Sequence, residues 1–141
     1  MQRRPLWQVQ WMAEFFEASA GERALTVSGT LTLTDGGCVL QLYGGTHAHV
    51  GSVTVSVPRP SLSDKERTSV TSSVINLLSH KEELVGRPAA EMLAVALNRP
   101  VVCVAGIHVE GATDDELKLL TMYCEEAANK LLQSACAASG L

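Results

Sequence analysis

Alternation of apolar and polar residues runs through the first half of the chain and predicts strands. Between residues 25 and 34, leucine and valine alternate with threonine and serine, a period of two typical of a half-buried strand. The same period is present at 7–11 and 53–57, and residues 38–43 are expected to form the strand that returns from a hairpin. A run rich in serine, threonine, valine and isoleucine at 68–78 predicts a further strand.

Glycine and proline separate these runs. Residues 19–23 and 44–49 are expected to form turns, and Asp35-Gly36-Gly37 is a tight hairpin signal. The strand that begins near residue 53 is expected to stop at Pro58, because proline cannot donate to a strand ladder. Residues 58–65 then form a loop. Strands joined by such short turns run antiparallel.

The period changes to a helical one after Ser79. A helix is expected over 81–97, kinked or divided in two at Gly86 and Pro88. Residues 101–105 are continuously apolar, which suits a strand buried on both faces. Thr113-Asp114-Asp115-Glu116 is a capping box that begins a long C-terminal helix.

These elements predict an α+β fold: a mostly antiparallel sheet of about six strands with two main helices, one between the last two strands and one C-terminal. With 141 residues, 46% hydrophobic and 18% charged, the chain has the composition of one globular domain, 1–141. A net charge of −4, with no basic cluster beyond Arg3-Arg4, argues against nucleic-acid binding. No apolar run is long enough to span a membrane, and residues 6–16 form no signal-peptide core, so a cytoplasmic location is expected.

The cysteines lie at wide, irregular spacings without a CxxC pair: Cys38, Cys103, Cys124 and Cys136. The signatures of structural zinc and of disulfide exchange are therefore missing. Three of the four fall in apolar strand or helix positions. Reduced core cysteines are the expected role.

Strand direction predicts where the histidines lie. If 25–34 runs upward, 38–43 descends to His47 and His49, the next strand ascends, and 68–78 descends to His80. The helix then climbs, and 101–105 descends to His108. All four histidines of the chain are thus expected at one end of the sheet, next to glycines and helix starts where ligands approach a backbone closely.

This convergence favours a ligand site and leaves its chemistry open. His47, His49 and His108 could form a three-histidine metal site, with Glu110 as a carboxylate that orients one of the rings. A nucleophilic enzyme fits less well, because the chain has no GxSxG elbow, and no phosphate loop of the GxGxxG or Walker type is present. Arg59, held between two prolines, is expected at the far end, where it could reach the site only from a second subunit.

Four strings, in order, carry a resemblance to a known family: residues 44–53 (GGTHAHVGSV), 57–62 (VPRPSL), 80–82 (HKE) and 105–109 (AGIHV). Over about 40–135 the chain resembles the LpdD-like prenylated-flavin chaperones, the family of the small gallate decarboxylase component. The interruption at Gly86-Arg87-Pro88 departs from the smoother helix expected of relatives.

The resemblance implies a cofactor-handling role and not a catalytic one. Such proteins accompany UbiD-type decarboxylases of aromatic acids, which use prenylated FMN, and the flavin prenyltransferase is a second implied partner. The resemblance and the topology together give a set of candidate cofactor-binding residues: Gly44, Gly45, Thr46, His47, His49, Gly51, Ser52, Arg59, His80, Lys81 and His108. Backbone amides of 44–52 are expected to bind the phosphate, and a homodimer is expected. The alternatives are a small metal-dependent enzyme using the three histidines and a ligand-free stabilising subunit of a decarboxylase complex.

Overall fold

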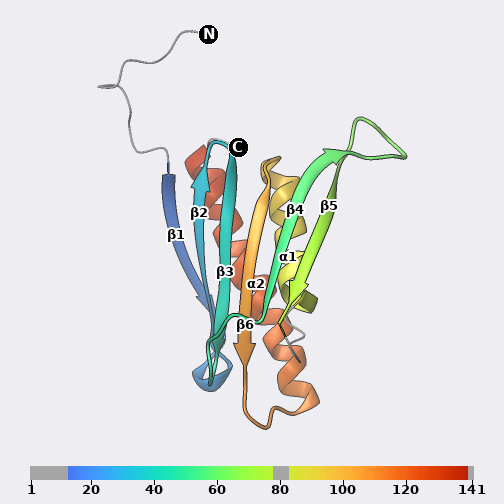
Figure 1. Ribbon diagram of the computed structural model, residues 1–141. Coiled ribbons are helices and arrows are strands. Elements are labelled where there is room, and N and C mark those ends of the chain that lie inside the picture. The colour runs from blue at the N-terminus through green and yellow to red at the C-terminus, as the bar shows by residue number, and fades with distance from the viewer. Residues whose placement is uncertain (1–12, 78–82, 140–141) are drawn as a thin grey trace.

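The computed structural model describes residues 13–77 and 83–139 (Figure 1). The predicted strand at 7–11 and the residues His80 and Lys81 lie outside these ranges. Along the chain the elements are β1 (Ala13–Ala20), the short 3₁₀ helix η2 (Arg23–Leu25), β2 (Val27–Thr34), β3 (Gly37–Gly45), β4 (Ser52–Pro60), β5 (Thr68–Asn76), α1 (Glu83–Leu97), β6 (Val101–His108) and α2 (Asp114–Ser139).

The six strands form one sheet in the order β1-β2-β3-β6-β4-β5. In this sheet the central pair, β3 and β6, is parallel, and the other neighbours are antiparallel. Both helices pack on the same face of the sheet (Figure 1). The predicted α+β architecture, with one helix before the last strand and one after it, is confirmed.

The core lies between this sheet and the helices. Leucines from alternate positions of β2 and β3, among them Leu31, Leu40 and Leu42, are fully buried against Leu93 of α1 and Leu131 of α2. The capping box begins α2 as predicted: the Glu116 amide donates to the Thr113 hydroxyl at 3.1 Å, and the Thr113 amide donates to the Glu116 carboxylate at 3.3 Å. Among the described helices, none is both long enough and apolar enough to cross a membrane.

β4 corrects the expectation that the strand stops at Pro58. It continues to Pro60 and pairs with β5 along its whole length, whereas it pairs with β6 only over Ser52–Ser56. Beyond Ser56, one edge of β4 therefore has no neighbouring strand among the described residues. Proline is tolerated at such an edge because its missing N–H is not needed for a ladder.

α1 is one continuous helix, so of the two predicted possibilities, a kink at Gly86 and Pro88 or a division in two, the division is wrong. Pro88 lies in the second turn of the helix, and it removes the one hydrogen bond that an amide there would donate to the Leu84 carbonyl. Gly86 serves packing: a Cβ added there would lie 3.1 Å from the Cβ of Ala105 on β6. Its missing side chain lets α1 lie close to the sheet.

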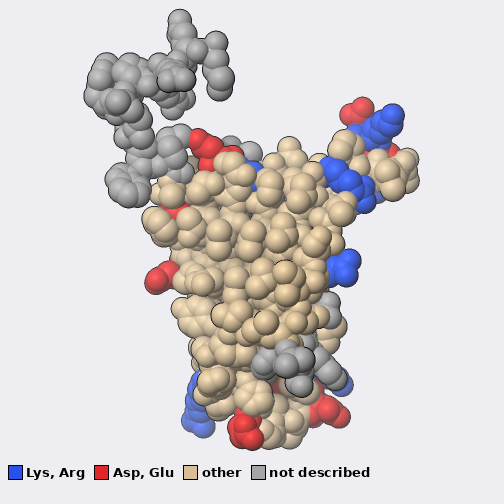
Figure 2. All heavy atoms as spheres, in the orientation of Figure 1, with Lys and Arg blue, Asp and Glu red and all other residues tan. Residues whose placement is uncertain are grey.

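The face of the sheet opposite the helices, hereafter the open face, is covered by no described helix. Figure 2 shows this face, and its centre consists of uncharged residues, with the charged ones at the margins. This surface borders the histidine-bearing loops described next.

Candidate functional site

The segment 46–51 joins β3 to β4 by crossing the end of β6 (Figure 1). The carbonyl of His108 accepts hydrogen bonds from the amides of Thr46 at 2.7 Å and His47 at 3.2 Å. The amide of His49 donates to Gly106, and that of Gly51 to Ala105. Residues that are far apart in the sequence are thus held together, and the predicted convergence of His47, His49 and His108 at one end of the sheet is confirmed.

Glycines make this crossing possible. At Gly106, a Cβ would lie 1.4 Å from the carbonyl oxygen of His49, so no side chain fits beneath the crossing segment. Gly45 has a φ of +75°, in the left-handed region, and a Cβ there would lie 2.1 Å from the His108 carbonyl oxygen. These glycines are needed for packing of backbone on backbone.

Within 44–52, whose backbone amides are expected to bind the phosphate, five amides already donate hydrogen bonds. The amides of Gly45, Thr46, His47, His49 and Gly51 all donate to carbonyls of the chain, that of Gly45 to Thr26 at 3.1 Å. An amide that already donates cannot hold a phosphate oxygen without losing its present acceptor.

The hydrogen bonds that hold segment 46–51 on the end of β6 form a clamp, and the side chain of Thr46 is part of it. Its hydroxyl donates to the His108 carbonyl at 3.2 Å and accepts from the Glu110 amide at 3.1 Å. The predicted ligand residue Thr46 therefore fixes the loop to the end of β6. The surface that it supports is formed by the histidines.

The hydrogen bonds of His49 and His108 define which ring nitrogen carries a proton. Nδ1 of His49 lies 3.1 Å from the His47 carbonyl, and Nε2 of His108 lies 3.1 Å from the Glu110 carboxylate. A carbonyl and a carboxylate only accept, so each of these nitrogens is the donor. In the neutral form, the other nitrogen of each ring is consequently an acceptor.

The rings of His47 and His49 stack, with centroids 5.4 Å apart and planes 16° apart. Stacked rings do not direct their nitrogens at one point, as metal ligands must. Within residues 13–77 and 83–139, no group of three or more His, Cys, Asp or Glu side chains is arranged to hold a metal ion. The three-histidine metal centre considered from the sequence is not assembled there, although Glu110 does contact His108.

The other candidate residues divide by location. Ser52 is fully buried beneath α1, and Gly51 is buried next to it. Arg59 lies near the opposite end of β4, as predicted, where its Nε donates to the Thr71 hydroxyl at 2.8 Å. Gly44 is half-buried, and a Cβ there would lie 2.2 Å from the Thr26 carbonyl oxygen. Among the described members of this set, the three histidines and Thr46 have side chains at the crossing, and the Thr46 hydroxyl is bonded to the backbone there.

Tyr43 is a member of this site that the sequence analysis does not identify. It pairs with Gly106, directly beside the crossing segment, and its side chain is 37% exposed. It also lines a depression of about 320 Å³ with Glu17, Ser19 and Ser28. The available signal is its position at the end of the predicted strand 38–43, immediately before Gly44.

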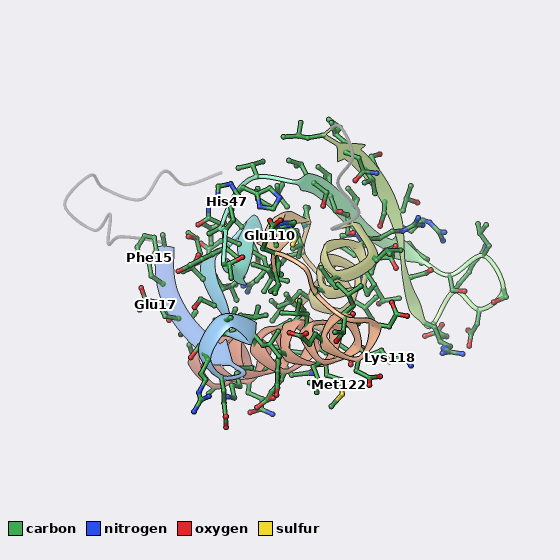
Figure 3. All side chains as sticks on the ribbon, turned by 90° about the horizontal axis from the view of Figure 1, so that it is seen from below. Phe15, Glu17, His47, Glu110, Lys118 and Met122 are labelled. Atoms are coloured by element: carbon green, nitrogen blue, oxygen red, sulfur yellow. The ribbon has the colours of Figure 1, made fainter. Side chains whose placement is uncertain are left out.

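Figure 3 gives the view from below. His47 and Glu110 lie on the side of the molecule away from Lys118 and Met122 of α2. A second cavity of about 300 Å³ lies between α1 and α2, lined by apolar residues such as Leu84, Met92 and Cys124. It contains none of the described histidines.

The cysteines have the structural role predicted for them. All four are free, and Cys38, Cys103 and Cys124 are buried. Burial raises the pKa of Cys103 and of Cys124 to about 12, so both thiols stay protonated at neutral pH. A protonated, buried thiol is neither a nucleophile nor a metal ligand.

Comparisons with known proteins agree with this fold and add the family. A search of curated proteins found no match. A chain of the solved structure "Crystal Structure of a Novel Chaperone Complex for Yeast 20S Proteasome Assembly" is similar, with a TM-score of 0.59, 14% sequence identity, and coverage of 88% of this chain and 98% of that chain. At that identity the likeness concerns the fold alone.

The family profile described as "Prenylated flavin chaperone LpdD-like domain" matches residues 21–136. This range extends from the turn after β1 almost to the end of α2, and it includes the crossing segment and the end of β6. The chain therefore belongs to the family of prenylated flavin chaperones with an LpdD-like domain.

Proposed function

We propose that the protein binds prenylated FMN as cargo and delivers it to a UbiD-type decarboxylase of aromatic acids, with the flavin prenyltransferase as its source. In this role it is a carrier and not a catalyst. Family membership supports the cargo. A reduced prenylated flavin reacts with oxygen, so a protein that holds it between two enzymes has a clear chemical purpose.

The observation that carries the proposal is the clamp of segment 46–51 on the end of β6. It holds His47 and His49 beside His108 through hydrogen bonds from Thr46 and His47 to one carbonyl. A backbone fixed in this way keeps histidines from distant parts of the sequence in a preformed arrangement. Preformed arrangements lower the entropic cost of binding.

The chemistry of these side chains suits a flavin ring. The isoalloxazine is flat and has an imide N–H beside its carbonyls. In neutral His108 the Nδ1 atom is an acceptor, because Nε2 donates to the Glu110 carboxylate at 3.1 Å, and such an acceptor can receive the imide N–H. Tyr43 offers an aromatic surface for the ring next to the crossing.

Anaerobic titration with reduced prenylated FMN, with plain FMN as the comparison ligand, tests the proposal. His49→Ala and His108→Ala should each weaken binding about fivefold, because a neutral hydrogen bond contributes about 1 kcal/mol net. Residues of one site should be non-additive, so the double variant should deviate from the product of the single effects.

Lys118→Ala on α2 is the control, since Lys118 lies on the side of the molecule away from His47 (Figure 3). It should bind as the wild type does. Far-ultraviolet circular dichroism and thermal melting establish that each variant is folded. Equal affinity of the folded histidine variants and the wild type, or histidine effects that multiply independently, would remove these residues from a common flavin site.

A further inference from the structure

The strand β4 has its polar side chains inside and its apolar ones outside. Ser52, Thr54 and Ser56 are fully buried beneath α1. Because side chains alternate along a strand, Val53 and Val55 consequently point to the open face. Val55 is 37% exposed there. A strand of a water-exposed sheet has the reverse arrangement.

The valines of β4 continue into a larger apolar surface. In the sheet register, Val53 pairs with Ile75 of β5 and Val104 of β6, and Val55 pairs with Val102. Val102 in turn pairs with Val39 of β3. We name this surface the valine patch, and its members are Val39, Val53, Val55, Val57, Ile75, Val102 and Val104.

The valine patch is contiguous over four neighbouring strands and is exposed. Ile75 is 67% exposed, and Val39 and Val57 are each 45% exposed. Isolated exposed valines are ordinary, whereas a contiguous apolar patch on a sheet marks a surface that another protein covers. The described helices all pack on the other face, so none of them covers it.

The charges on the open face are few and of opposite sign. By strand alternation the charged residues on the described strands there are Glu17 on β1 and Arg59 on β4, and both lie outside the patch. Glu17 is near the middle of the edge strand β1, and Arg59 is near the end of β4. A surface with one charge of each sign does not repel a second copy of itself.

The open face is also large enough for a stable dimer. Six strands spaced about 4.8 Å apart, each about eight residues of roughly 3.3 Å, cover roughly 700 Å². Stable interfaces bury about 600 to 1,000 Å² on each partner, and the whole open face falls within that range. Face-to-face sheets bury such surfaces when they stack about 10 Å apart.

We infer that a second copy of this chain covers the valine patch, so that two sheets stack through their open faces about a two-fold axis. The same patch then serves both copies, as a two-fold interface requires. This interface goes beyond the flavin proposal and does not depend on it, because it follows from register, exposure and charge.

The test compares Val55→Lys with Val95→Lys by light scattering coupled to size-exclusion chromatography. Val95 lies on α1 and is 41% exposed, close to the 37% of Val55, so the two substitutions differ in location and little in burial. The wild type and Val95→Lys should have the mass of two chains. Val55→Lys should be a folded monomer at micromolar concentration, because two lysines desolvated in one interface weaken it at least about a hundredfold.

Two results would overturn the inference. If the wild type is a dimer and a folded Val55→Lys remains one, a different surface pairs the chains. If the wild type is a monomer, no second copy covers the patch. If in addition the tryptophan emission of Val55→Lys lies to the red of that of the wild type, residues 1–12, which contain both tryptophans, cover the patch instead. A dimer that fails to bind flavin would reject the functional proposal and leave this interface intact.

Discussion

At the scale of single residues, the glycines decide the geometry of the site. Gly106 lies directly beneath the carbonyl of His49, and Gly45 beside that of His108. The sequence suggests that glycine makes room for a ligand, whereas at these two positions it makes room for the chain itself. Single-residue roles of this kind cannot be predicted from sequence, because they depend on which distant backbone comes close.

Gly106→Ala tests this role. The new methyl group would meet the His49 carbonyl oxygen at 1.4 Å, so the crossing segment must move. We expect the free energy of unfolding to fall by roughly 2 kcal/mol, as is typical of overpacking. Chemical denaturation measures it.

Gly36→Ala is the matched control, since a Cβ at Gly36 meets nothing within 4 Å. Its free energy of unfolding should stay within about 0.5 kcal/mol of the wild type. If Gly106→Ala changed the free energy of unfolding as little as Gly36→Ala does, the contact between the crossing segment and β6 would not be rigid enough to hold a histidine site.

At the scale of elements, the sequence patterns predict the strands and their directions well. The alternation of 25–34, followed by the hairpin signal and the strand 38–43, indicates the antiparallel pair β2–β3. Strand direction then places His47, His49 and His108 at one end of the sheet, which the hydrogen bonds to His108 and Gly106 confirm. The directions of successive strands can be predicted because strands joined by short turns run antiparallel.

The pattern does not predict which face of β4 is buried. Alternation defines two faces, and the apolar one is normally expected inside. In β4 the hydroxyl-bearing Ser52, Thr54 and Ser56 are inside instead. Ser56 has a partner in Ser72 at 2.7 Å, whereas the hydroxyls of Ser52 and Thr54 have none among the described residues.

Thr54→Val should therefore stabilise the protein. Valine has nearly the shape of threonine and removes a buried hydroxyl that lacks a described partner. A gain of about 1 kcal/mol in the free energy of unfolding is expected, or a rise of roughly 3 °C in Tm. Differential scanning calorimetry measures both.

Ser56→Ala is the opposite case, because it leaves Ser72 without the 2.7 Å hydrogen bond. It should lower the free energy of unfolding by about 1 kcal/mol. A loss of stability in Thr54→Val would mean that its hydroxyl is bonded in solution, for example to an internal water.

At the scale of the whole molecule, the order of the strands departs from the order of the chain in one place. β6 lies between β3 and β4, and so it separates the meander β1-β2-β3 from the hairpin β4-β5. The sequence predicts the direction of β6 but not its position between β3 and β4, because a continuously apolar run does not indicate which strands lie on either side of it. The same insertion brings His108 to the crossing segment.

The insertion of β6 determines when the histidine end can form during folding. The meander β1-β2-β3 and the hairpin β4-β5 each have local contacts and can form early. β6 pairs with both only after α1 has brought the chain back to the sheet, and such non-local contacts form slowly. In pulsed hydrogen exchange during refolding, the amides of β5 should become protected first. The amides of Thr46 and His47, which donate to the His108 carbonyl, should follow in the slowest phase. Simultaneous protection would contradict this order. If it holds, a chain that is still folding has no histidine site, and the proposed flavin cargo can bind only to the finished protein.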